Sequence, residues 1–176
     1  MSTTSSDLRQ HLSPLWSRYS DLIAERAEGA YVYTTDGRRL LDFTCGIGVT
    51  NTGHCHPRVV AAVHEQVGKL IHGQINLLYH RPVLELVEQL LQVAPGHLSS
   101  FFLANSGAEA VEASIKLARQ ATGRPNLIVF QGSFHGRTIG AMSLTTSSTV
   151  YRAGYQPLMA GVFVAPFPYA YRYGWS

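Results

Sequence analysis

Apolar residues recur along the chain with two different spacings, one typical of amphipathic helices and the other of buried strands. Spacings of three and four residues predict helices over residues 14–23, 57–67, 84–91 and 107–121. Short unbroken apolar runs predict strands at 100–103, 127–130 and 162–165. The second half of the chain therefore alternates strands with helices, which is the pattern of an α/β fold.

A hairpin is predicted nearer the amino end. Residues 30–33 and 39–43 are β-prone, and the segment that joins them contains Asp36-Gly37, a strong hairpin signal. Residues 1–12 are predicted to form a frayed tail. We therefore expect two parts. Residues 1–55 form a segment with a helix and a small antiparallel element, and residues 56–176 are the amino-terminal part of a larger domain.

The turn at Ser106, Gly107 and Ala108 separates a predicted strand from a predicted long helix. The first turn of a helix leaves backbone N–H groups unpaired, and the helix dipole adds positive potential there, so phosphate is a common occupant. Ser106 can add a hydroxyl donor, and Gly107, which lacks a Cβ, lets a ligand approach the backbone. The alternative is an ordinary helix that Ser106 caps.

A second polar segment lies on the same predicted rim. The order strand, helix, strand over residues 100–130 predicts a βαβ unit with parallel neighbouring strands, and ligands bind outside the carboxyl ends of such strands. Residues 134–137 follow the second strand and supply the Phe134 ring and the His135 imidazole. A planar heteroaromatic ring with a phosphate tail, such as pyridoxal phosphate, would use both segments. Otherwise Phe134 belongs to the core and His135 hydrogen-bonds within its loop.

Two other motifs carry weaker predictions. The glycines of residues 46–53 partly match the dinucleotide fingerprint, but Asn51 stands at its sixth position and no helix follows directly. His54, Cys55 and His56 suggest zinc, yet no second Cys/His pair stands at finger spacing, so we predict no metal site. We expect Pro57 to begin a helix, with the histidine before it serving as a cap or as a packing residue.

Composition and charge exclude several classes of function. The net charge of +3 comes without a basic cluster, which argues against nucleic-acid binding. No apolar run is long enough for a membrane span, and residues 1–7 lack the apolar core of a secretory signal. With Cys45 and Cys55 as the only cysteines, the cytoplasm is the expected compartment.

Three motifs together resemble the class III pyridoxal-phosphate-dependent aminotransferases, most nearly the group of 4-aminobutyrate aminotransferase and its ω-amino-acid relatives. They are Asn51-Thr52-Gly53-His54-Cys55-His56-Pro57, Ser106-Gly107-Ala108-Glu109-Ala110-Val111-Glu112 and Phe134-His135-Gly136-Arg137-Thr138. The resemblance covers residues 29–170. It implies the fold type I of aspartate aminotransferase, here incomplete: a parallel or mixed sheet with flanking helices and a small antiparallel element.

The resemblance also implies roles for individual residues. Ser106, Gly107 and Ala108 would bind the cofactor phosphate, Phe134 would stack on the cofactor ring, and His135 would lie in the same pocket. Ile47 and Val49, on the glycine loop, would contact substrate at the entrance. Glu109 and Glu112 follow the phosphate turn, where either a place near the cofactor or a solvated helix face would explain them.

The catalytic lysine of this family has no counterpart here. Family members hold the cofactor as a Schiff base on a lysine, and an aspartate pairs with the pyridine nitrogen. The chain's lysines are Lys69 and Lys116, both within predicted helices, and its last aspartate, Asp42, precedes the phosphate turn. We therefore expect a fragment that is inactive alone.

The resemblance favours amino-group transfer from an ω-amino acid such as 4-aminobutyrate to a 2-oxo acid, by a homodimer in the full-length form. A mutase, epimerase or decarboxylase of the same fold remains open. A different class of hypothesis is a non-catalytic truncated product, or a partner subunit that docks on a full-length enzyme.

Overall fold

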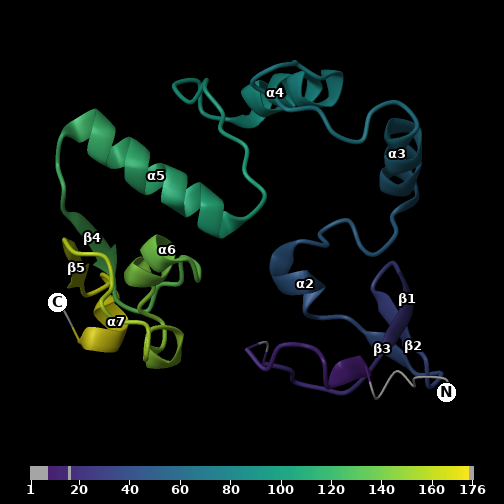
Figure 1. Ribbon diagram of the computed structural model, residues 1–176, viewed down its shortest axis with the longest axis horizontal. Helices are drawn as coiled ribbons and strands as arrows, with labels where there is room; N and C mark the ends of the chain where they lie inside the picture. The colour runs from purple at the N-terminus through teal and green to yellow at the C-terminus, as the bar shows by residue number, and fades with distance from the viewer. Residues whose placement is uncertain (1–7, 16, 175–176) are drawn as a thin grey trace. The chain divides into compact units, whose positions relative to one another are not determined.

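The structure, a computed structural model, describes residues 8–15 and 17–174 and divides into two compact units (Figure 1). The first unit comprises Met1–Arg81 and the second comprises Pro82–Ser176. The predicted frayed tail of residues 1–12 falls largely on residues 1–7, outside the described residues, and the expectation about a secretory signal also concerns residues 1–7. The boundary predicted between residues 55 and 56 concerns the domains of a larger protein and stays a prediction.

The first unit contains a three-stranded antiparallel sheet in the order β1-β2-β3. Its strands are β1 (Ala24–Glu28), β2 (Tyr31–Thr34) and β3 (Arg39–Leu41). Glu28 pairs with Tyr31 across the first turn, and Tyr33 pairs with Arg39 across the second. The hairpin predicted around Asp36-Gly37 is thus confirmed as β2 and β3.

The helix predicted over residues 14–23 is wrong. The described residues of this segment are irregular, with Leu15 77% and Tyr19 99% exposed. An amphipathic helix gains most of its stability from packing its apolar face, and here that face meets no partner. The next residues instead form β1, because the edge of β2 offers backbone hydrogen-bonding groups. The sequence pattern did not predict this strand.

Two elements follow the sheet in the first unit. A short turn, α2 (Cys45–Gly48), carries positive φ angles at successive residues and is not a regular helix. The helix α3 (Pro57–Val67) begins at Pro57, as predicted, and His56 is its N-cap, with its ring accepting a hydrogen bond from the Arg58 amide. The predicted cap and helix start are therefore confirmed.

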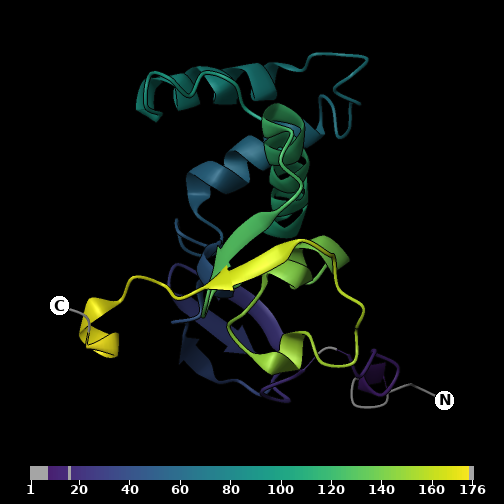
Figure 2. The ribbon, with the colours of Figure 1, turned by 90° about the vertical axis from the view of Figure 1, so that its left-hand side faces the viewer.

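The second unit holds the main core of the described residues. The helix α4 (Arg81–Val93) begins at the division, and the long helix α5 (Gly107–Thr122) follows. The strands β4 (Leu127–Phe130) and β5 (Val162–Ala165) form where their apolar runs predicted strands, and they pair in parallel (Figure 2). Between them lie α6 (Ile139–Leu144) and the 3₁₀ turn η1 (Thr149–Tyr151), and α7 (Ala170–Tyr173) ends the described chain. Ile115, Val129 and Leu144 form the core.

The strand predicted at residues 100–103 does not form, and β4 pairs only with β5 among the described strands. The βαβ unit predicted over residues 100–130 therefore does not form, because its first strand is absent from the described residues. A strand exists only when its backbone groups find a partner, and an apolar run alone does not supply one. Phe102 remains 75% exposed as a result.

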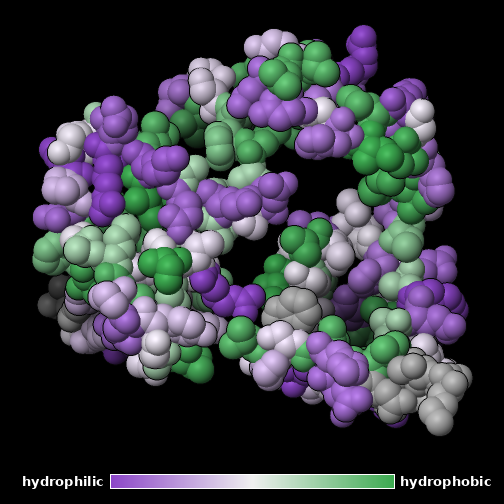
Figure 3. Space-filling model, in the orientation of Figure 1, coloured by the Kyte–Doolittle hydropathy of each residue, from purple (hydrophilic) through white to green (hydrophobic). Residues whose placement is uncertain are grey.

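Apolar side chains on α3 and α4 are largely exposed, and Figure 3 shows apolar surface over both helices. The predicted buried side of α3 is an example, since Val63 is 61% and Val67 52% exposed. That expectation is wrong in this structure, because the faces have the periodicity but no packing partner. Among the described residues, no helix is long and apolar enough to cross a membrane.

Candidate cofactor-binding site

The turn before α5 is built around a capping box. Ser106 has an extended backbone, and its hydroxyl accepts a hydrogen bond from the Glu109 amide at 3.2 Å. The Glu109 carboxylate reaches back to the amides of Asn105, at 2.6 Å, and Ser106, at 3.1 Å. This reciprocal arrangement is the ordinary cap that the sequence left as an alternative. It also explains Glu109, which is a capping residue here.

The cap leaves donors that fit a phosphate group. Among the described residues, the Gly107 and Ala108 amides have no hydrogen-bond partner, and they are the first two N–H groups of a sixteen-residue helix. A Cβ added at Gly107 would meet nothing within 4 Å, so the backbone there is open to a ligand. The Ser106 hydroxyl accepts from Glu109 and can still donate its own proton. The cap and the anion site are therefore compatible.

Direct packing brings the segment after β4 to this turn. Gly136 is buried with φ +140°, and a Cβ added there would lie 2.8 Å from the Ala108 Cβ and 3.0 Å from the Ala141 Cβ. Only glycine permits this approach without displacing the backbone. The two segments predicted to share a rim do meet. They meet through the contact between Gly136 and Ala108, and not through neighbouring strands as predicted.

A buried threonine fixes the backbone on either side of Gly136. The His135 amide donates to Thr145 Oγ1 at 3.0 Å, and that oxygen lies 3.1 Å from the Gly136 carbonyl, to which its hydroxyl donates. Thr145 itself is fully buried. The Phe134 ring packs edge-on against Tyr151, with 5.2 Å between ring centroids, and is 54% exposed. Phe134 is therefore not a core residue, and its ring remains accessible.

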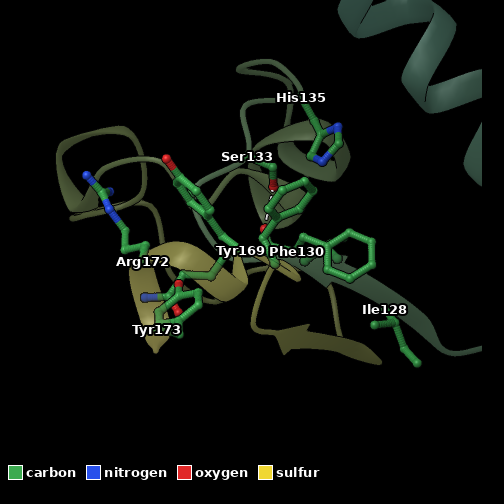
Figure 4. A pocket seen from close by; sticks show the side chains of 11 residues that line it. Ile128, Phe130, Ser133, His135, Tyr169, Arg172 and Tyr173 are labelled. Atoms are coloured by element: carbon green, nitrogen blue, oxygen red, sulfur yellow. Dashed lines mark hydrogen bonds between the residues drawn. The ribbon is translucent and has the colours of Figure 1, made fainter. Parts of the chain in front are cut away.

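His135 lines a cavity of about 590 Å³ at the carboxyl ends of β4 and β5. Figure 4 shows Phe130, Ser133 and Tyr169 in its wall together with His135, and Arg172 farther along it. The Ser133 hydroxyl donates to the Phe130 carbonyl at 2.7 Å. The position matches the general rule that ligands bind beyond the carboxyl ends of parallel strands.

The two residues predicted to contact substrate lie in the first unit. Ile47 is 96% and Val49 75% exposed, on the loop that contains α2. Ile47 has φ +64°, a conformation that is costly for a β-branched residue. The surrounding contacts hold the loop in this shape. Their role in binding substrate stays a prediction.

The loop is anchored by hydrogen bonds to Asp42 that the sequence did not single out. Asp42 Oδ2 lies 2.8 Å from His54 Nε2, while Oδ1 accepts from the Thr44 amide and hydroxyl and from the Cys45 amide. These hydrogen bonds, from Thr44 first and then from His54, hold the pKa of Asp42 far below its usual range. His54 is further fixed by backbone pairing with Gly29. The His54 imidazole therefore has a carboxylate as a hydrogen-bond partner.

A family comparison gives these features a context. The model of the class-III aminotransferases matches residues 14–174. A probable 4-aminobutyrate aminotransferase of Bacillus subtilis is 44% identical over 85% of this chain and 35% of that protein. The acetylornithine aminotransferase of Archaeoglobus fulgidus is 43% identical over 90% of this chain and 41% of that protein.

A solved structure agrees with these relatives. The adenosylmethionine-8-amino-7-oxononanoate aminotransferase of Methanocaldococcus jannaschii superposes with a TM-score of 0.80 at 31% identity, over 88% of this chain and 38% of that one. The predicted fold class is thereby confirmed. The chain spans little more than a third of the length of these relatives. It belongs to the class-III aminotransferase family, whose members are pyridoxal-phosphate-dependent transaminases.

Proposed function

We propose that this chain supplies phosphate and ring contacts for pyridoxal phosphate in an aminotransferase that moves an amino group from an ω-amino acid to a 2-oxo acid. The observation that carries this proposal is the packing of Gly136 on Ala108, which joins the open helix N-terminus to the segment of Phe134 and His135. When bound, the cofactor supplies an electron sink for bond cleavage at the amino-bearing carbon.

The residues of the second unit would bind and orient. The Gly107 and Ala108 amides and the Ser106 hydroxyl donate to phosphate oxygens, and the positive end of α5 favours their negative charge. The accessible Phe134 ring offers a surface for stacking. His135, held through its backbone by Thr145, presents its imidazole to the cavity.

The substrate contacts are proposed from exposure and chemistry. Ile47 and Val49 present apolar side chains to substrate from a loop held in a costly conformation. Arg137 directly follows Gly136 and is exposed. A guanidinium forms bidentate hydrogen bonds with carboxylates, so Arg137 is our candidate for the substrate carboxylate. The relatives' names, 4-aminobutyrate, 5-aminovalerate and acetylornithine aminotransferase, support an ω-amino donor.

We further propose that this polypeptide does not turn over substrate alone. Lys116 lies ten residues beyond Ser106 on the same helix, about 15 Å along its axis, so it cannot reach the phosphate turn. Lys69 belongs to the first unit and pairs with Glu65. The helix α5 therefore keeps Lys116 away from the turn at its own N-terminus. This observation also favours the second candidate, a non-catalytic product or subunit that docks on a full-length enzyme.

Cofactor binding with and without reduction tests both parts of the proposal. The purified chain is mixed with pyridoxal phosphate, its visible spectrum is recorded, and borohydride reduction is followed by peptide mass mapping. We expect binding that inorganic phosphate displaces, with no adduct at Lys69 or Lys116 that depends on Ser106. Pyridoxal, which lacks the phosphate, is the ligand control and should bind more weakly.

Ser106→Asp is the matched protein variant. Aspartate is also a good N-cap, so the helix should persist while the added charge repels phosphate. A lysine adduct lost in this variant would show that the chain builds its own covalent site, and the inactivity proposal would be wrong. Absence of any binding to the wild-type chain would overturn the proposed cofactor contacts.

We propose a homodimeric full-length form in the cytoplasm. The exposed apolar faces of α3 and α4 support burial against further protein. Cys45 and Cys55 are free thiols, which agrees with a reducing compartment.

A further inference from the structure

Glu112 makes contacts that the capping box and the phosphate turn do not explain. It lies four residues after Ala108 on α5, so the two residues share a helix face. Ala108 packs against Gly136, and Glu112 Oε1 accepts hydrogen bonds from the Thr138 hydroxyl at 2.5 Å and the Ala141 amide at 3.1 Å. One helix face is thus joined at two points to residues 136–141.

Residues Thr138 and Gly140 pack closely around the Glu112 carboxylate. A Cβ added at Gly140 would lie 2.7 Å from Glu112 Oε1 and 2.8 Å from its carboxyl carbon, so a side chain there would displace Glu112. Thr138 is the N-cap of α6, and its hydroxyl donates to Glu112 while it also accepts from the Ala141 amide. The carboxylate therefore joins the first turn of α6 to the middle of α5.

We infer that Glu112 is a positioning residue that holds the segment of Phe134 and His135 in register with the helix N-terminus at Ser106. The inference rests on the proposed cofactor contacts. A ligand that uses both its phosphate and its ring needs a fixed spacing between the two segments, because misplacement loses one contact when the other forms. A ligand that uses only one segment does not depend on that spacing.

Three ligands separate positioning from folding. The chain and its Glu112→Ala variant are tested for binding of pyridoxal phosphate, pyridoxal and inorganic phosphate by equilibrium dialysis. We expect Glu112→Ala to weaken pyridoxal phosphate binding roughly tenfold, the size typical of losing hydrogen bonds to a charged group. Binding of pyridoxal and of inorganic phosphate should change less than about twofold, because the capping box of Ser106 and Glu109 is intact. An equal loss for all three ligands would mean a merely structural role and would overturn the inference.

Two variants act as controls. Glu112→Gln keeps an oxygen that can accept from Thr138 and Ala141, so it should restore pyridoxal phosphate binding to within about threefold. Glu88→Ala removes an exposed carboxylate from α4 and should change none of the three affinities. Failure of Glu112→Gln to rescue binding would contradict positioning through these hydrogen bonds.

Hydrogen exchange in the ligand-free chain gives a readout that does not depend on the cofactor. Glu112→Ala should accelerate exchange at the amides of His135 and Ala141, whereas Glu112→Gln should not. Unchanged exchange in Glu112→Ala would overturn the inference by itself. If exchange responds as expected while the wild-type chain binds no pyridoxal phosphate, the proposed function fails and the positioning role stands.

Discussion

The two candidate binding segments of this chain are held in shape by different physical means. In the first unit, hydrogen bonds from His54 and Thr44 to Asp42 anchor the glycine loop, and Ile47 has a costly backbone conformation. In the second unit, close packing of Gly136 on Ala108 and a helix cap hold the candidate phosphate turn. The comparison teaches that steric contact determines the shape of one segment, whereas hydrogen bonds to a carboxylate determine the shape of the other. Substitutions should distinguish these two ways of holding a segment in shape.

The largest effect is expected from Gly136→Ala. The new Cβ would overlap Ala108, and the positive φ would strain any L-residue, so we expect a loss of about 3 kcal/mol or more in the free energy of unfolding of the second unit. Denaturant titration measures it. Gly132→Ala is the matched control, since Gly132 also has a positive φ but its Cβ would meet nothing within 4 Å. Equal losses in both variants would show that backbone strain, and not packing, matters.

A smaller and more local effect is expected from Asp42→Ala. The variant removes the acceptor of the Thr44 and Cys45 amides and leaves His54 without its carboxylate. We expect faster amide hydrogen exchange at Thr44 and Cys45. Asp42→Asn keeps an acceptor oxygen without the charge and should protect these amides to an intermediate degree. Identical exchange in Asp42→Ala and wild type would show that the loop does not need this anchor.

Ser106→Ala should cost about 1 kcal/mol of stability, the usual value of an N-cap. It also removes a hydroxyl donor, so phosphate binding should weaken. Ser106→Thr retains both functions and should restore them, which denaturant titration and phosphate binding can check. A stability loss without any change in phosphate affinity would assign Ser106 to capping alone.

The smallest effect is a dependence on pH that is confined to the loop of the first unit. Because hydrogen bonds lower the pKa of folded Asp42, its stabilising contribution is complete above the unfolded value of about 3.9 and is lost as the pH falls below it. The NMR shift of the Thr44 amide should therefore be insensitive to Asp42 between pH 7 and 5 and should move in acid. The same titration of Asp42→Asn should lack this transition, and its persistence would assign the transition to another group.

Local signals predicted much of the fold. The Asp36-Gly37 hairpin, the start of α3 at Pro57 and the apolar runs of β4 and β5 were all predicted and form. The hairpin depends on the geometry of its turn, and the start of α3 depends on a proline that has no N–H group to leave unpaired. The strands depend on apolar runs. Residues next to one another in the sequence decide all of these features. The failures share a different cause. Residues 14–23 and 100–103 have suitable patterns, but a helix face and a strand edge each need a partner elsewhere in the chain.

The candidate site shows the same division between features set by neighbouring residues and features that need distant partners. The sequence by itself identified the family through its three motifs, and it predicted the capped start of α5, because a helix cap is a local arrangement. Only the tertiary structure decided that Gly136 packs on Ala108, that Asp42 pairs with His54, and that Glu112 joins α5 to α6. These contacts link residues far apart in sequence, and no local pattern encodes their distances. The sequence therefore determined the family and the local elements, whereas the distances between the candidate site residues depended on the fold.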